Sequence, residues 1–133
     1  MLPEKRLLQA AVALACIVPL SAGLFGMIKG AAFLGGGSAD MDSHVRYLSG
    51  LLFGIGVGFA TTIPTIEKHS QRFRLLTYIV VAGGLARLLG LIAAEPGAAM
   101  KAALAMELVV TPALCLWQHR IAKRYFSSIT SVD

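Results

Sequence analysis

The chain alternates between long apolar segments and short polar ones. The apolar segments cover residues 7–28, 46–66, 75–94 and 98–118. Each has about 20 residues, enough for a helix to span a hydrocarbon core of ~30 Å. A helix suits lipid because it satisfies its own backbone hydrogen-bonding groups. The pattern therefore predicts an all-α fold, an integral membrane four-helix bundle that forms one domain over residues 1–133.

The composition supports a membrane protein. Hydrophobic residues make up 56% of the chain and charged residues only 14%, and the mean hydropathy is +0.73. A soluble domain has about a quarter charged residues. The composition is therefore atypical of a soluble domain of this size.

Eight of the 12 lysine and arginine residues lie beside alternate ends of the apolar segments. They are Lys5, Arg6, Lys68, Arg72, Arg74, Arg120, Lys123 and Arg124. By the positive-inside rule, this predicts that both termini, the 67–74 loop and the tail 119–133 are cytoplasmic. The net charge of +5 is then a signal of topology rather than of nucleic-acid binding. The expected partners are membrane lipids, whose anionic headgroups attract such charges.

The amino terminus has features of a secretion signal, with Lys5 and Arg6 before an apolar run and small residues at 21–23. The apolar run nevertheless continues to Ile28. We therefore expect an uncleaved first membrane helix, with Pro19 as a kink.

Two charges interrupt the last two apolar segments. A charge at the bilayer centre costs at least ~2.5–3.5 kcal/mol on insertion scales, so it needs a partner or a water-lined cavity. Arg87 and Glu107 lie ~10 and ~15 Å along their helices from the turn at Glu95–Gly97, at similar depth. We predict that they pair. The alternatives are that Arg87 extends its stem to the headgroups, or that the pair is purely structural and only sets the helix register.

Glycines recur at helical spacing in the second and third segments. Gly50, Gly54 and Gly58 repeat every four residues, and Gly83 and Gly90 share a face with Arg87. Small residues at this spacing let helices approach closely. We expect these five glycines to mark helix packing, although a groove for a ligand would also use small residues.

A candidate ligand site follows from the predicted topology, which places Arg46, Arg87 and Glu107 in the outer half of the bundle. Two arginines against one glutamate leave an excess positive charge, and arginine pairs well with carboxylate or phosphate. His44 lies near Arg46, and Thr111 shares the face of Glu107 at i+4. These five residues are the predicted ligand-binding set. Asp40, Asp42 and Ser43 are interpreted as helix-capping residues rather than calcium ligands.

The sequence contains no motif that predicts catalysis, a cofactor or a metal. No nucleophile–histidine set, dinucleotide fingerprint or metal-ligand cluster is present, and Cys16 and Cys115 are interpreted as apolar fillers. We assign no catalytic residues, cofactor or metal, and a non-enzymatic role is favoured.

The stretch from Arg46 to Glu107 resembles a family of small bacterial four-helix membrane proteins of unknown function, grouped with the DoxX/DoxD-like proteins. The resemblance rests on residues 46–50 (RYLSG) with Gly54 and Gly56, on residues 84–91 (GLARLLGL), and on Glu107-Leu108. It implies a four-helix bundle in the bacterial cytoplasmic (inner) membrane. It implies no activity, because fold does not fix function.

Three functions are compatible with these features. The first is a binding or accessory subunit whose Arg–Glu centre holds the bundle together and binds an anionic or polar lipid-like ligand. The second is a quinone-linked redox enzyme subunit of DoxD-like type, by analogy alone. The third is a small ion or proton transporter, which would have to act as an oligomer because no inverted repeat is detectable. A homo-oligomer or a larger membrane complex fits all three.

Overall fold

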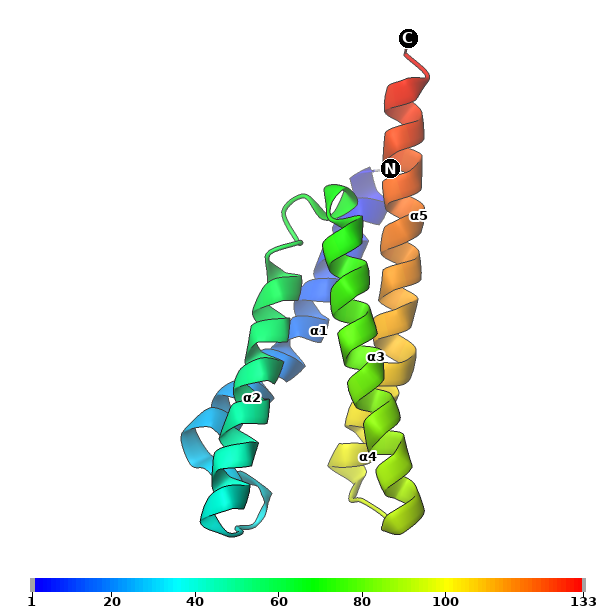
Figure 1. Ribbon diagram of the computed structural model, residues 1–133. Coiled ribbons are helices and arrows are strands. Elements are labelled where there is room, and N and C mark those ends of the chain that lie inside the picture. Colours follow the sequence, from blue (N-terminus) through cyan, green and yellow to red (C-terminus); the bar gives the residue numbers. More distant parts are fainter. Residues whose placement is uncertain (1, 133) are drawn as a thin grey trace. The chain divides into compact units, whose positions relative to one another are not determined.

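The computed structural model describes residues 2–132, and every regular element in this range is helical. The elements are α1 (Leu2–Lys29), η1 (Gly30–Leu34), α2 (Ala39–Ala60), η2 (Ile66–Lys68), α3 (Ser70–Ala93), α4 (Ala98–Ala105), η3 (Met106–Val110) and α5 (Thr111–Thr130). Because α4, η3 and α5 follow one another without a break, residues 2–132 form four long helices (Figure 1). The predicted all-α fold is confirmed.

Three helical stretches among residues 2–132 are long and apolar enough to cross a membrane. They are Pro3–Leu34, Ser70–Ala93 and Ala98–Thr130. Helix α2 is not among them, and its first half carries Asp40, Asp42, His44 and Arg46. The sequence predicted four such spans, and the structure supports three.

Several helix ends differ from the predicted ones. Helix α2 ends at Ala60 rather than near residue 66, because Pro64 follows and cannot continue a helix. Helix α3 begins at Ser70, so Arg72 and Arg74 belong to its first turns rather than to a loop. Helix α5 continues to Thr130, so most of the predicted cytoplasmic tail 119–133 is helical.

Contacts divide the chain into two compact units. Unit 1 contains residues 2–8 and 65–132, and unit 2 contains residues 9–64. Each unit is a helical hairpin with its own close contacts.

Unit 2 packs α1 antiparallel to α2 through glycines. A Cβ added to Gly23 would lie 2.7 Å from the backbone nitrogen of Phe53, and one added to Gly56 would lie 3.0 Å from Leu20 Cδ2. The packing glycines of the second segment were predicted to be Gly50, Gly54 and Gly58. A Cβ on Gly50 would only reach Met27 Sδ at 4.0 Å, and one on Gly54 would meet nothing within 4 Å, while Gly58 is half-buried.

The connection inside unit 2 depends on two glycines with left-handed backbones. Gly35 and Gly36 have φ of 98° and 102°, a region that favours glycine. Ser38 then caps α2, its Oγ accepting a hydrogen bond from Met41 N at 3.2 Å. The predicted capping residues were Asp40, Asp42 and Ser43. The two aspartates instead lie in the first turn, where the helix dipole favours negative charge.

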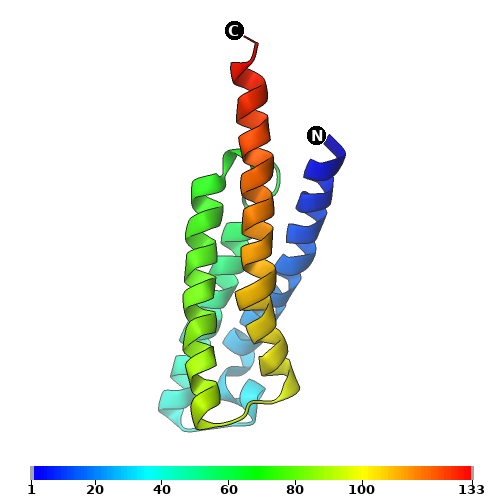
Figure 2. The ribbon, with the colours of Figure 1, turned by 90° about the vertical axis from the view of Figure 1, so that its right-hand side faces the viewer.

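Unit 1 packs α3 against the continuous helix formed by α4, η3 and α5. The two run side by side in both views (Figures 1 and 2). The two helices approach closely at Gly84, where an added Cβ would lie 2.8 Å from Leu108 Cδ2 and 3.0 Å from Glu107 Cβ. The predicted packing glycines of α3, Gly83 and Gly90, have nothing within 4 Å of that position. The packed face therefore passes through Gly84, one residue from the predicted one.

Replacing Gly84 by valine should destabilise unit 1, because the new side chain would overlap Leu108 and Glu107. Overpacking of this kind costs about 1–3 kcal/mol. The matched control is Gly83→Val, which adds the same β-branched residue in open space. We expect the thermal midpoint of the purified protein in detergent to fall for Gly84→Val and to stay near wild type for Gly83→Val. Equal midpoints would show that α3 does not approach its neighbour at Gly84.

Candidate functional site

The predicted Arg87–Glu107 contact is present in unit 1. Arg87 Nε donates to Glu107 Oε2 and Nη2 donates to Oε1, both at 3.1 Å, so the pair is bidentate. Charge-assisted bonds of this geometry are stronger than neutral ones and fix orientation as well. The side chains are 35% and 18% exposed. The pair therefore joins α3 to the fourth long helix while leaving one side of the guanidinium accessible.

The third nitrogen of the Arg87 guanidinium, Nη1, makes only a weak hydrogen bond. Nη1 donates to Met100 Sδ at 3.1 Å, and a thioether sulfur is a weak acceptor. An oxygen acceptor in the same place would make a stronger hydrogen bond.

Glu107 lies in the π-helical segment Met106–Val110, and we attribute this segment to Pro112, which follows it. Proline has no N–H and its ring clashes with the carbonyl four residues earlier, so a regular α-helix is disfavoured there. Thr111 N–H bonds to Met106 O, five residues back, and Thr111 Oγ1 donates to the same oxygen at 2.9 Å. Single π-helical turns are frequent at functional sites.

Thr111 therefore has a different role from the predicted one. Its hydroxyl is bonded to Met106 O, and the residue is only 8% exposed. The extra residue in the π-helical turn alters the i, i+4 relation on which the shared face with Glu107 was predicted. Thr111 supports the backbone that holds Glu107.

Arg46 has its own set of partners within unit 2. Its Nε donates to Asp42 Oδ2 at 2.8 Å, and its Nη1 donates to the carbonyl oxygens of Met27 and Ile28 at 2.7 and 3.0 Å. The guanidinium thus occupies the carboxyl-terminal end of α1, where a cation is favoured. His44 is exposed. The grouping of Arg46 and His44 with Arg87 stays a prediction.

The Asp42–Arg46 pair also corrects the predicted charge of the centre. Asp42 Oδ1 accepts a hydrogen bond from Ala31 N at 2.8 Å, and Asp42 Oδ2 accepts one from Arg46 Nε at 2.8 Å. Each arginine therefore has a carboxylate of its own. The excess positive charge expected from two arginines and one glutamate is absent.

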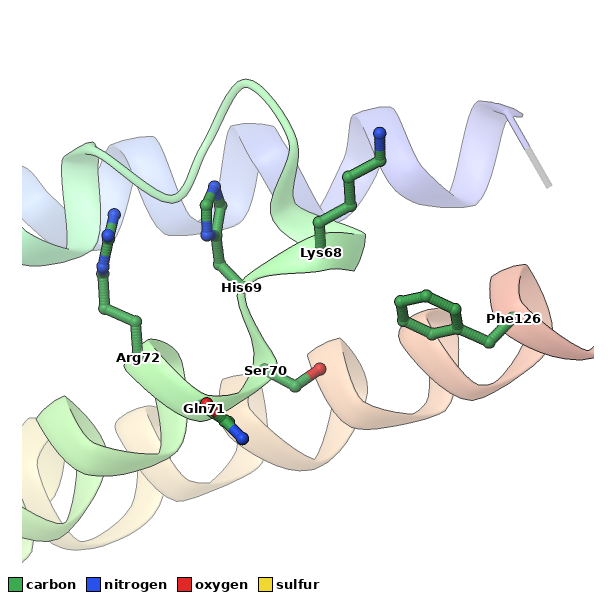
Figure 3. Close-up of a pocket in the computed structure, with 6 residues that line it drawn as sticks. All are labelled: Lys68, His69, Ser70, Gln71, Arg72 and Phe126. Atoms are coloured by element: carbon green, nitrogen blue, oxygen red, sulfur yellow. The ribbon is translucent and has the colours of Figure 1, made fainter.

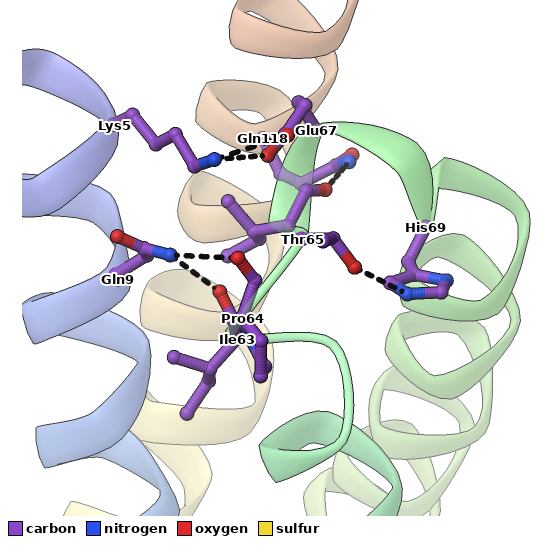
Figure 4. A network of polar contacts seen from close by, with 9 residues as sticks. Lys5, Gln9, Ile63, Pro64, Thr65, Glu67, His69 and Gln118 are labelled. Carbon is purple, nitrogen blue, oxygen red and sulfur yellow. Dashed lines mark hydrogen bonds and ion pairs between the residues drawn. The ribbon is translucent and has the colours of Figure 1, made fainter. Parts of the chain in front are cut away.

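A second polar cluster, which the sequence analysis missed, lies in unit 1 where residues 2–8, η2 and α5 meet. Lys5 Nζ lies 3.0 Å from Glu67 Oε1 and 2.9 Å from Oε2, and Gln118 Nε2 donates to Ile66 O at 2.7 Å and to Ser70 Oγ at 3.0 Å. Figure 4 shows the Lys5–Glu67 and Gln118 contacts, together with the hydrogen bond between Thr65 Oγ1 and His69 Nε2.

This cluster is surrounded by the best-buried side chains of unit 1. Leu8 and Ile66 are fully buried, and Phe73, Ile121 and Gln118 are 1% exposed. Glu67, which was predicted to begin the cytoplasmic 67–74 loop, is only 5% exposed. A sequence signal existed in the opposite charges of Lys5 and Glu67 on the same predicted side of the membrane. No feature of the sequence indicated that Gln118 would be buried and donate to the main-chain carbonyl of Ile66.

Among residues 2–132 there is no group of three or more histidine, cysteine, aspartate or glutamate side chains that could hold a metal ion. Cys16 is buried and Cys115 half-buried, and both are free thiols.

Burial is the largest single influence on Glu67 and raises its pKa, but the hydrogen bond from Lys5, a backbone hydrogen bond and the charges of Lys5 and Lys68 together hold the pKa of this carboxyl below its ordinary value of 4.5. A lowered pKa in the folded state contributes stability above pH 4.5 that is lost as the pH falls through the folded-state pKa. We expect the thermal midpoint to decrease as the pH is lowered from 6 to below 4.5.

Glu67→Gln should lower the midpoint at neutral pH and reduce this acid-dependent decrease. The matched control is Glu95→Gln, because the Glu95 side chain is 80% exposed. This control should keep the wild-type pH profile. An unchanged acid slope in Glu67→Gln would show that the Lys5–Glu67 pair does not contribute to stability.

Comparison with protein-family models matches residues 7–118 to one model, described as a domain of unknown function (DUF4345). The searches of curated proteins and of solved structures each found no match.

Proposed function

Because the chain belongs to the DUF4345 family, whose function is unknown, we propose a role from its own geometry: a multi-pass membrane protein that acts as a binding or accessory subunit. The observation that carries this proposal is the bidentate Arg87–Glu107 pair, held between two helices of membrane-spanning length. The DoxX/DoxD-like grouping and the bacterial inner membrane rest on the sequence resemblance and are part of the proposal.

Placement in a bilayer is supported by the surfaces of the helices. Large apolar side chains such as Leu14, Ile79, Leu89, Ile92 and Leu116 are 46–85% exposed. Water would disfavour so much exposed apolar surface, and lipid covers it. In this placement the positive-inside rule puts the termini and the segment between α2 and α3 on the cytoplasmic side.

Helix α2 supplies the fourth span in this proposal. Its 22 residues extend about 33 Å, at 1.5 Å per residue. The charges in its first half are compatible with the membrane interface, because Arg46 and Asp42 neutralise one another and Arg46 also bonds to two carbonyls of α1.

The polar centre has two roles in this proposal. Its bidentate geometry sets the register between α3 and the helix that carries Glu107. Its weakly partnered Nη1 donates a hydrogen bond to a polar, lipid-like ligand, whose carbonyl, hydroxyl or phosphate oxygen takes the place of Met100 Sδ. An anionic group there competes with Glu107 for the guanidinium, so a neutral acceptor suits the geometry better.

Two alternative functions are also compatible with the π-helical turn at Glu107. A quinone-linked redox subunit of DoxD-like type would retain a quinone or another absorbing cofactor on purification. An oligomeric proton or ion transporter would move its ion across proteoliposome membranes, and Glu107→Gln would abolish that flux, since intramembrane carboxylates serve such relays.

A charge-swap cycle tests the polar centre. Arg87→Glu or Glu107→Arg alone places like charges in contact, and breaking a buried pair costs up to about 3–5 kcal/mol. We expect each single variant to lose folded yield and thermal stability in membranes or detergent, and the double variant to recover most of both.

The exposed Glu95–Lys101 pair is the matched control, with side chains 80% and 50% exposed. Exposed pairs contribute about 0–1 kcal/mol, so the swaps Glu95→Lys and Lys101→Glu should have little effect. If the Arg87 and Glu107 single swaps are tolerated equally well, the centre does not organise the bundle and the proposal fails.

A further inference from the structure

Met100 places a thioether beside a cation and near the exposed end of a helix. Its Sδ lies 3.1 Å from Arg87 Nη1, and it belongs to the first turn of α4, where its N–H donates to Gly97 O at 3.1 Å. Met100 is half-buried, and the side chain of Lys101 on the same turn is 50% exposed. The sulfur is therefore joined to the polar centre and lies close to the exposed end of unit 1.

Met100 lies at the opposite end of α3 from a groove of about 500 Å³ in unit 1. The charge of Lys68 in that groove acts on the Glu67 carboxylate, and Arg72 has an interaction of its own. These cations are therefore already engaged, and Met100 is separate from them. The groove is shown in Figure 3 and is lined by Lys68, His69, Ser70, Gln71, Arg72 and Phe126.

A thioether can be oxidised reversibly. Peroxides convert methionine to its sulfoxide, and methionine sulfoxide reductases restore the thioether. A sulfur lone pair attacks one oxygen of hydrogen peroxide, the O–O bond breaks, and the other oxygen leaves as water with both peroxide protons. Sulfur is oxidised and the peroxide is reduced, so no further reactant is needed. The contact of Met100 Sδ with Arg87 Nη1 occupies one sulfur lone pair and leaves the other for this attack.

The product of this oxidation has a hydrogen-bond donor already in place. A sulfoxide carries a polar oxygen, whereas the thioether that it replaces is a weak acceptor. A hydrogen bond from a guanidinium to an oxygen is charge-assisted and stronger than one between neutral groups. Oxidation of a core methionine disrupts packing, but at Met100 the new oxygen forms beside Arg87 Nη1. The sulfoxide should therefore strengthen the link between α3 and α4.

We propose that Met100 is a site of reversible oxidation by peroxide, and that Arg87 Nη1 binds the oxygen of the resulting sulfoxide. The inference rests on the proposed function, in which a ligand oxygen takes the place of Met100 Sδ at the same nitrogen. Oxidation supplies that oxygen from within the chain, and it closes the polar centre to the ligand until the sulfoxide is reduced.

Two substitutions at Met100 test whether Arg87 Nη1 binds an oxygen at this position. Met100→Gln places a side-chain carbonyl near the position of the sulfur, whereas Met100→Leu provides an apolar side chain without an acceptor. Leucine, methionine and glutamine have similar helix propensities. We expect the thermal midpoint of Met100→Gln in detergent to exceed that of Met100→Leu by about 4 °C. The matched control is Met41 in unit 2, which is 52% exposed, and where the same two substitutions should give equal midpoints.

Treatment with hydrogen peroxide tests the oxidation itself. Peptide mass spectrometry of the treated wild type measures the sulfoxide at Met100, with Met41 as the exposed reference. We expect a sulfoxide at Met100 and a higher thermal midpoint than in the untreated protein. Methionine sulfoxide reductases that act on both epimers should return the midpoint to its original value. The Met100→Leu variant, treated in the same way, should show no rise.

The two experiments separate failure of this inference from failure of the proposed function. If Met100→Gln exceeds Met100→Leu but no sulfoxide forms at Met100, or if oxidation does not raise the midpoint, the oxidation site is refuted and the ligand role of Nη1 stands. Equal midpoints for Met100→Gln and Met100→Leu would show that Nη1 binds no oxygen at this position. That result would overturn both the inference and the ligand role.

Discussion

The bidentate contact between Arg87 and Glu107 is the constraint on which unit 1 depends. Two ionised side chains on helices this apolar are tolerated only if they meet, and they meet only in one register of α3 against the helix that carries Glu107. Gly84 makes that register possible, because it brings the backbone of α3 against Glu107 and Leu108. The ion pair and the glycine contact are therefore two parts of one arrangement.

Unit 2 also combines an ion pair with a close glycine contact. Arg46 bonds to Asp42 and to two carbonyls that α1 leaves unsatisfied at its end. Gly30 has a φ of +59° and lies directly beneath the Asp42 carboxylate, where a Cβ would overlap it. In both hairpins, a glycine provides the space in which a charged pair closes.

Two features of the sequence allowed correct predictions: the long apolar segments, and two opposite charges at similar depth in neighbouring segments. These predicted the helices and the Arg87–Glu107 contact. Helix ends were less predictable, since α3 and α5 continue into charged residues that helices tolerate well, as at Arg72 and Lys123. The sequence analysis placed the packing face of α3 at Gly83, whereas the structure places it at Gly84. The spacing of small residues does not determine how a helix is rotated about its own axis. The contacts of Glu67 and Gln118 depend on how distant segments meet, which no local pattern encodes.

The π-helical turn has a consequence for how the fourth long helix faces its neighbour. Its one extra residue per turn offsets the two flanking α-helical parts by about 100°. Deleting one residue between Ala105 and Thr111 would remove that offset. Met100 and Lys101 would then rotate away by that angle relative to α5. The guanidinium of Arg87 would lose its sulfur neighbour, so the composition of the polar centre depends on the length of this five-residue segment as well as on its side chains.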